Sequence, residues 1–146
     1  MTFEPDISVF RPDRPGIRKV LGDLEAEIME LIWARPVEQS TTVRDIFEIL
    51  YDRRRIAYTT VMSTMSRLAK KHLLRVLKQD QTYIYYPNVT QQEFISRFVG
   101  RILEDLLVSF TGETLRAFEQ QGPSSSAEQA RHMLDEITRQ RRKEQE

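Results

Sequence analysis

Residues 57–87 restrict the fold more than any other stretch, because a helical pattern there leads directly into two strand-like runs. In AYTTVMSTMSRLAKKHLL the apolar residues recur at spacings of three and four, as on a helix with one buried face. LLRVLK and TYIYYP follow, joined by the polar residues QDQ, and their aromatic and β-branched residues favour strands. We expect a helix over residues 57–71 and a hairpin over residues 73–86. Because the turn lacks glycine, we do not expect the tightest type of hairpin.

Two further helices are predicted ahead of this segment. The first begins near Gly22 and ends before Pro36, since proline disfavours helix in the residue that precedes it. The second begins in the hydroxyl cluster at residues 40–42, a good source of helix caps, and ends near the arginines at 53–55. Three helices followed by a hairpin is the order of a winged helix-turn-helix domain, which we place at residues 21–89. The fold class is therefore mostly α with a small β-hairpin.

Positive charge is concentrated within this domain. The chain has 22 basic and 22 acidic residues, so its net charge is zero and argues against a general affinity for nucleic acid. From Arg53 to Gln79, however, there are eight basic side chains and no acidic one. The block is either a solvated face or a local surface for DNA. The arginines at 53–55 likewise either interact favourably with the negative end of a helix dipole or contact phosphate.

In a winged domain the third helix enters the major groove of DNA, and this geometry assigns roles to its outer face. Thr59, Thr60 and Ser63 are expected to point outward, where hydroxyls can contact base edges. Cationic side chains near the end of the helix and on the hairpin would contact phosphates. The expected backbone contacts are Arg53, Arg54, Arg55, Lys70, Lys71 and Lys78, and Arg67 is positioned to join them.

Residues 1–20 are expected to form a basic irregular arm. Pro5, Pro12 and Pro15 interrupt any regular period. The arm also carries four basic side chains within residues 11–19. It either lies in solvent or reaches along the DNA.

Residues 90–146 are predicted to form a helical dimerisation domain with a polar C-terminal tail. Large apolar residues recur every four positions from Phe94 to Phe110, with a second row beside them. Such a stripe exceeds what a small winged domain can cover, so it needs a partner surface. The expected homodimer interface is Phe94, Phe98, Val99, Ile102, Leu103, Leu106, Leu107, Phe110, Leu134 and Ile137. Alternatively, the chain is a protein-interaction module whose apolar helix docks a different partner.

Other classes of function find little support in the composition. The chain has no cysteine, which excludes thiolate metal sites and cysteine catalysis. His72 and His132 are isolated, and no phosphate-binding loop or nucleophile motif is present. We therefore expect no catalytic residues, no metal and no cofactor. No apolar run approaches the length of a membrane span, and the N-terminus does not look like a secretion signal, so we expect a cytoplasmic protein without membrane contact.

Several motifs in combination resemble the BlaI/MecI/CopY family of penicillinase-type transcriptional repressors. The motifs are LGDLEAEIMELIW, TVRDIFEIL, AYTTVMSTMSRLAKKHLL and YIYYPNVTQQEF, and the resemblance covers about residues 21–110. It implies a winged helix domain followed by a helical dimerisation domain. It also implies a homodimeric repressor that binds a dyad-symmetric operator in double-stranded DNA. By match to the recognition helix, the implied base contacts are Thr59, Thr60, Ser63 and Arg67.

Three departures from the family pattern affect these expectations. The family often has Gly-Arg at the hairpin tip, whereas Asp80-Gln81 stands here, which leaves Lys78 as the nearest cation. Copper-responsive members use C-terminal cysteines, and this chain has none. Some members are inactivated by cleavage at an Asn-Phe bond, but Asn88, the single asparagine, precedes Val89. We expect release from DNA by a small ligand, a partner or a different protease, and the sequence identifies no particular inducing ligand, sensor or protease.

Overall fold

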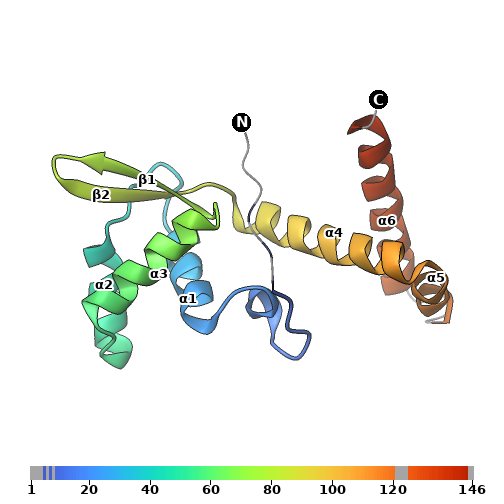
Figure 1. The fold of residues 1–146 in the computed structure, drawn as a ribbon, viewed down its shortest axis with the longest axis horizontal. Coiled ribbons are helices and arrows are strands. Elements are labelled where there is room, and N and C mark those ends of the chain that lie inside the picture. Colours follow the sequence, from blue (N-terminus) through green and yellow to red (C-terminus); the bar gives the residue numbers. More distant parts are fainter. Residues whose placement is uncertain (1–4, 6, 8, 121–124, 145–146) are drawn as a thin grey trace. The chain divides into compact units, whose positions relative to one another are not determined.

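A computed structural model describes residues 5, 7, 9–120 and 125–144, and within 125–144 only some of the side chains. The chain divides into two compact units, residues 1–96 and residues 97–146, which are described separately. Figure 1 shows the elements in chain order. They are the short 3-10 helix η1 (Gly16–Lys19), α1 (Asp23–Trp33), α2 (Val43–Arg54), α3 (Tyr58–Lys70), β1 (Leu74–Gln79), β2 (Thr82–Pro87), α4 (Gln91–Ser109), α5 (Thr111–Gln120) and α6 (Ser125–Glu144). The described fold is thus mostly helical with one antiparallel hairpin, as the sequence predicts.

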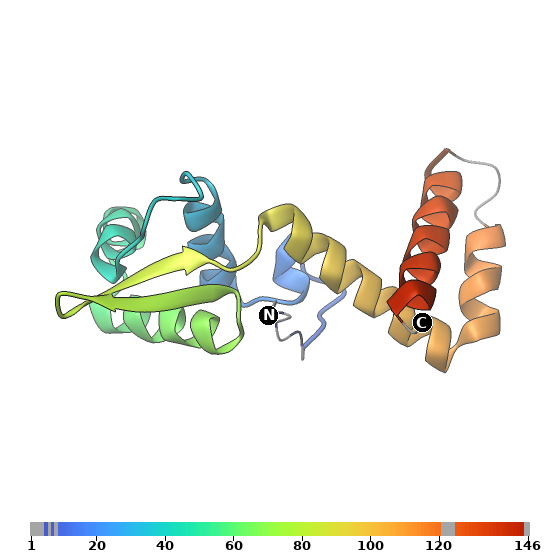
Figure 2. The ribbon, with the colours of Figure 1, turned by 90° about the horizontal axis from the view of Figure 1, so that it is seen from above.

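The first unit is built on the buried faces of α1, α2 and α3. Their apolar residues fall at helical spacing, so each helix presents one face to the common core. α3 contacts α1, α2 and β1, and Figure 2 shows the hairpin extending along α3. The side chains that are almost fully buried include Ile28, Met29, Ile32, Ile46, Leu50, Val61, Met65 and Leu68. This arrangement of three helices and a hairpin is a winged helix-turn-helix domain.

The ends of α2 and α3 follow from particular residues. The Thr42 hydroxyl accepts a hydrogen bond from the Asp45 N–H at 3.1 Å, and the Thr42 N–H donates to the Asp45 carboxylate at 3.0 Å. This reciprocal capping box confirms the predicted start of α2. Arg55 and His72 adopt the left-handed conformation after α2 and α3, with φ of 56° and 65°. Histidine tolerates this conformation better than most side chains, which suits it to the end of α3.

The hairpin turn differs from its prediction. Gln79 pairs with Thr82, so only Asp80 and Gln81 form the loop, and both have positive φ, 49° and 66°. A two-residue loop with both residues left-handed has the backbone of a type I′ turn, the tight turn that matches the twist of the strands. The expectation of a looser turn was therefore wrong. The twist of the paired strands selects this turn, although only one of the two residues, the aspartate, is favoured at positive φ.

The middle of β2 is tied to the segment that precedes α2. The Thr41 N–H donates to the Tyr85 carbonyl at 3.0 Å, and the Tyr85 N–H donates to the Thr41 carbonyl at 2.8 Å. These two bonds form an isolated antiparallel bridge. The bridge fixes β2 beside the start of α2, and so it brings one side of the hairpin close to the N-terminus of that helix.

The N-terminal arm is less irregular than predicted. Residues 16–19 form the 3-10 helix η1, and Ile17 and Val20 are buried. Arg14 and Arg18 form ion pairs with Asp23 at the start of α1. Burial of the apolar side chains supplies the free energy that orders this segment. The described residues 16–20 thus belong to the first unit.

The beginning of α4 also belongs to the first unit. Phe94, which was expected at the homodimer interface, is fully buried within the single chain, and its ring centroid lies 5.8 Å from that of Trp33. The Trp33 indole N–H donates to the Val89 carbonyl at 2.9 Å. The Thr90 hydroxyl accepts from the Glu93 N–H and caps the helix. The division between the two units therefore falls a few residues after the boundary expected at residues 89 and 90.

The second unit consists of the rest of α4 with α5 and α6, and α5 contacts α6. The polar stretch 138–144, part of the predicted C-terminal tail, continues the helix α6. The side chains of Leu134 and Ile137 lie outside the described part of the chain. Several large apolar side chains of this unit are exposed, namely Leu106, Val108, Phe110 and Leu115. In the described ranges, no helix is both long and apolar enough to cross a membrane.

Candidate nucleic-acid interface

The exposed face of α3 carries all four residues for which base contacts are predicted. Val61, Thr64, Met65 and Leu68 are buried, which leaves the opposite side of the helix at the surface. The exposed side chains are Tyr58, Thr59, Thr60, Met62, Ser63, Ser66, Arg67 and Lys70. This surface presents hydroxyl groups along most of its length and cations toward its C-terminal end.

Two hydroxyl groups of α3 are already engaged by the helix. The Ser63 hydroxyl donates to the Thr60 carbonyl at 3.1 Å, and the buried Thr64 hydroxyl donates to the same oxygen at 2.7 Å. A hydroxyl has one proton and two acceptor sites. With its proton directed into the helix, Ser63 presents an acceptor at the surface, which suits an amino group on a base edge.

The two adjacent lysines at the end of α3 have different environments. Lys70 is exposed. The Lys71 ammonium lies 2.8 Å from the carboxylate of Glu25 on α1, and Glu25 is buried. The other carboxylate oxygen of Glu25 accepts from the Gly22 N–H at 3.0 Å. Lys71 therefore joins α1 to α3, whereas Lys70 is available to a partner at the surface.

The ion pair with Lys71 affects the pKa of Glu25. Burial alone would raise the pKa of this carboxyl group, because it disfavours the charged form. The hydrogen bonds from Lys71 and Gly22, together with the positive charges of Lys71 and Arg67, outweigh that effect and lower the pKa. Glu25 is thus held as a carboxylate beneath the C-terminal end of α3.

The three consecutive arginines are also held differently. Arg53 and Arg54 both pair with Glu27 on α1, and the Arg53 pair spans 3.4 Å. The Arg55 guanidinium lies 4.6 Å from the ring centroid of Tyr51, in cation–π geometry. The first two arginines therefore link α2 to α1, and contact with a phosphate would have to compete with Glu27.

The hairpin contributes cations from both of its faces. The Lys78 ammonium lies 5.8 Å from the ring centroid of Tyr83, and the Arg75 guanidinium lies 5.1 Å from that of Tyr86. The positions alternate along β1, so the two cations project from opposite faces. Lys78 is exposed two positions before the tip loop, where it was expected to replace the missing cation of the tip.

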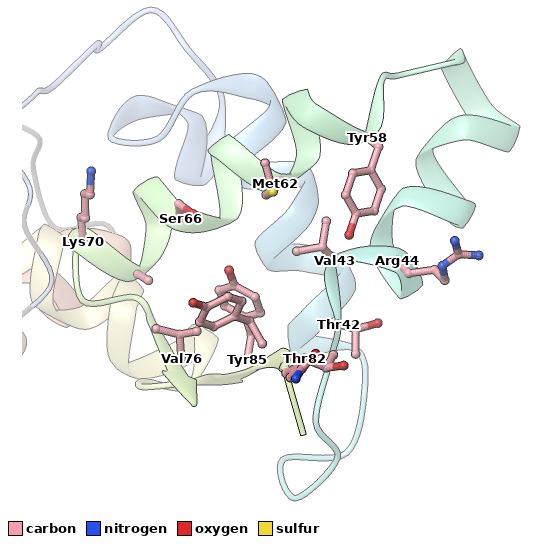
Figure 3. A pocket seen from close by; sticks show the side chains of 13 residues that line it. Thr42, Val43, Arg44, Tyr58, Met62, Ser66, Lys70, Val76, Thr82 and Tyr85 are labelled. Carbon is pink, nitrogen blue, oxygen red and sulfur yellow. The ribbon is translucent and has the colours of Figure 1, made fainter. Parts of the chain in front are cut away.

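A groove of about 930 Å³ lies between α3, the start of α2 and the hairpin. Figure 3 shows Tyr58, Met62, Ser66 and Lys70 along α3, with the start of α2 and the strands around them. These four residues are spaced by four, so they form one row on the helix. The lining residues include two cations, Arg44 and Lys70, and no carboxylate.

The sequence prediction missed most of this row, together with Arg44 at the start of α2. It selected the neighbouring hydroxyl positions and overlooked Tyr58 and Met62, because exposed apolar residues were assigned to no DNA contact. The spacing of four from Tyr58 to Lys70 was the signal that could have identified them. In the described part of the chain, no three acidic or histidine side chains are grouped to hold a metal ion.

Comparison with known proteins places these features in a family. The penicillinase repressor family matches residues 21–139. Proteins called transcriptional regulator BlaI, from two strains of Mycobacterium tuberculosis, are 42% identical over 76 residues, which is 52% of this chain and 54% of theirs. The chain thus spans about half the length of these relatives. A penicillinase repressor from Bacillus licheniformis is 24% identical over 98 residues, covering 62% of this chain and 74% of that protein. The solution structure of the DNA-binding domain of the repressor BlaI is similar with a TM-score of 0.45 and 24% identity, over 56% of this chain and 95% of that one.

Proposed function

Because the chain belongs to the penicillinase repressor family, we propose that it is a transcriptional repressor that recognises a DNA operator through α3. The observation that carries this proposal is the exposed face of that helix, where hydroxyl groups stand next to cations. The surrounding segment, residues 53–79, contains no acidic side chain. Such a surface suits a major groove, in which base edges lie between two rows of phosphates.

In this proposal, α3 lies in the major groove and its residues divide by role. Thr59, Thr60, Ser63 and Arg67 contact base edges, since their side chains are exposed along the helix. Lys70 and Lys78 contact phosphates, because both are exposed and neither is part of an ion pair in the described residues. These backbone contacts fix the register of the helix without reading sequence.

The remaining predicted backbone contacts differ in how readily they reach DNA. Arg55 stacks on Tyr51 and stays exposed, so it can approach a phosphate without losing a carboxylate partner. Arg53 and Arg54 would exchange Glu27 for a phosphate. Lys71 is held by the buried Glu25, and we assign it a role in the fold, with only a long-range electrostatic effect on DNA.

We further propose that the second unit forms a homodimer and that the operator has dyad symmetry. Leu106, Val108, Phe110 and Leu115 expose apolar surface that a second copy of the same unit would cover. A symmetric interface lets one face satisfy itself. Linking two winged domains also raises the effective concentration of the second domain at its half-site, which can increase affinity by about 10²–10⁴-fold. A repressor of this kind acts in the cytoplasm and needs no catalytic residue.

Selection of bound sequences from random duplex DNA tests the proposal. We expect the purified protein to enrich a dyad-symmetric sequence and to bind it more tightly than scrambled duplex. Thr60→Ala and Ser63→Ala should each lose about 5- to 150-fold of this preference, the equivalent of roughly 1–3 kcal/mol for a good base contact. Ser96→Ala removes an exposed helix hydroxyl on α4 and serves as the matched control. Enrichment of no sequence would contradict the proposal and favour a protein-interaction module instead.

A further inference from the structure

A partly exposed apolar side chain stands midway along α3, on the side that faces the hairpin. Met62 is 43% exposed, whereas Met29 and Met65 are fully buried. Tyr58 precedes it by one turn and Ser66 follows it by one turn, so Met62 lies midway along the helix, on the side that faces the hairpin. A large part of this apolar side chain is therefore open to a partner at the surface.

The surroundings of Met62 fit a strand of DNA better than a protein or an apolar ligand. Figure 3 shows Met62 at the groove between α3 and the hairpin, with Tyr85 and Val76 on the opposite side. The groove is continuous with the row of α3 residues that carries Lys70. Its lining holds cations and no carboxylate, which is complementary to a polyanion.

Only one group on the major-groove edge of the four base pairs is apolar, the C5-methyl group of thymine. The hydroxyl of Ser63 contacts polar atoms on a base edge, so this predicted contact leaves a thymine methyl group unread. A thioether is flexible and polarisable, and it can cover a methyl group whose position is set by the rest of the interface. We propose that Met62 contacts a thymine methyl group and makes one base of each half-site a specificity determinant. This inference rests on the proposed function.

The test removes the methyl group from the DNA and the thioether from the protein. Each thymine of the selected duplex is replaced in turn by deoxyuridine, which differs only in lacking the methyl group. For one thymine of each half-site, we expect the wild type to lose about fourfold in affinity, the value expected for one methyl-sized apolar contact. Met62→Ala should bind the original duplex more weakly and should not respond to deoxyuridine at that position.

Two further variants keep the result interpretable. Met62→Leu preserves an apolar side chain of similar size and should remain sensitive to the loss of the methyl group. Ser63→Ala changes the neighbouring position and should also remain sensitive. Circular dichroism during thermal unfolding checks that each variant folds. Insensitivity of the wild type at every thymine, or equal losses for the wild type and Met62→Ala, would overturn the inference. Failure to select any duplex would instead count against the proposed function.

Discussion

At the scale of single residues, two adjacent lysines at the end of α3 have different roles. Lys71 stabilises the fold, and Lys70 is proposed to contact DNA. Lys70 is exposed, and Lys71 is bonded to the buried carboxylate of Glu25. Lys70→Ala should leave the free energy of unfolding nearly unchanged and reduce the slope of log affinity against log salt by about 0.9 for each half-site contact. Lys71→Ala should lower the free energy of unfolding by about 1–3 kcal/mol, because Glu25 loses its partner. Denaturant titration and binding at several salt concentrations measure both effects, and equal behaviour of the two variants would contradict the assignment.

Glu25 makes the free energy of unfolding of the first unit depend on pH. Its pKa is lowered in the folded protein, so the charged form is favoured by folding. The resulting stability is fully present above the ordinary pKa of 4.5 and is lost as the pH falls below that value toward the lowered pKa of the folded state. Glu25→Gln should be less stable near neutral pH and should lose less stability between about pH 5 and pH 3.

Thermal unfolding across this pH range is the appropriate measurement for Glu25. Glu48→Gln, a change at an exposed carboxylate on α2, is the matched control and should follow the wild type. The same loss of stability below pH 4.5 in the wild type and in Glu25→Gln would show that another carboxyl group dominates acid unfolding.

At the scale of elements, the hairpin turn offers a direct test of backbone strain. Gln81 adopts a φ of 66°, a conformation that costs most L-residues about 1–2 kcal/mol. Gln81→Gly removes this cost but adds freedom to the unfolded chain, so we expect a net gain of about 0.5–1 kcal/mol. Gln79→Gly, at a strand position two residues earlier, should destabilise the protein instead. A loss of stability in Gln81→Gly would contradict the type I′ geometry of the turn.

The elements also show which features can be predicted from sequence alone. Helices such as α3 follow from the spacing of their own residues, and the start of α2 follows from the short-range pair Thr42 and Asp45. The tight turn was missed because strand twist, not local preference, selects it. The bond between Glu25 and Lys71 joins residues 46 positions apart, and only the packing of α1 on α3 brings them together.

As with the fold, only part of the candidate site could be predicted from the sequence. The exposed hydroxyl positions of α3 follow from its buried face, so a helical period suffices to find them. The groove beside them depends on the hairpin and on the bridge between Thr41 and Tyr85, which no local pattern specifies. The pairing of Arg53 and Arg54 with Glu27 was likewise not predictable, because it requires the contact of α2 with α1.

At the scale of the whole molecule, the proposal depends on a second copy covering the apolar surface of the second unit. Leu106 is 42% exposed in the single chain. Leu106→Asp would place an unpaired charge in the proposed interface and should give monomers that bind the operator about 10²–10⁴-fold more weakly. Ser96→Asp adds the same charge at an exposed polar position of α4 and should stay dimeric. Sedimentation velocity distinguishes these outcomes, and a monomeric wild type would contradict the proposal.

The central claim is that α3 and the hairpin form the surface that meets DNA. The most direct measurement is a titration of the isotopically labelled protein with the selected duplex, followed by NMR of its backbone amides and methionine methyl groups. We predict that the largest shift changes fall within residues 58–70 and 74–87 and include the Met62 methyl group. Residues 111–120 should change little. Large changes confined to residues 97–120, with α3 unaffected, would contradict the account.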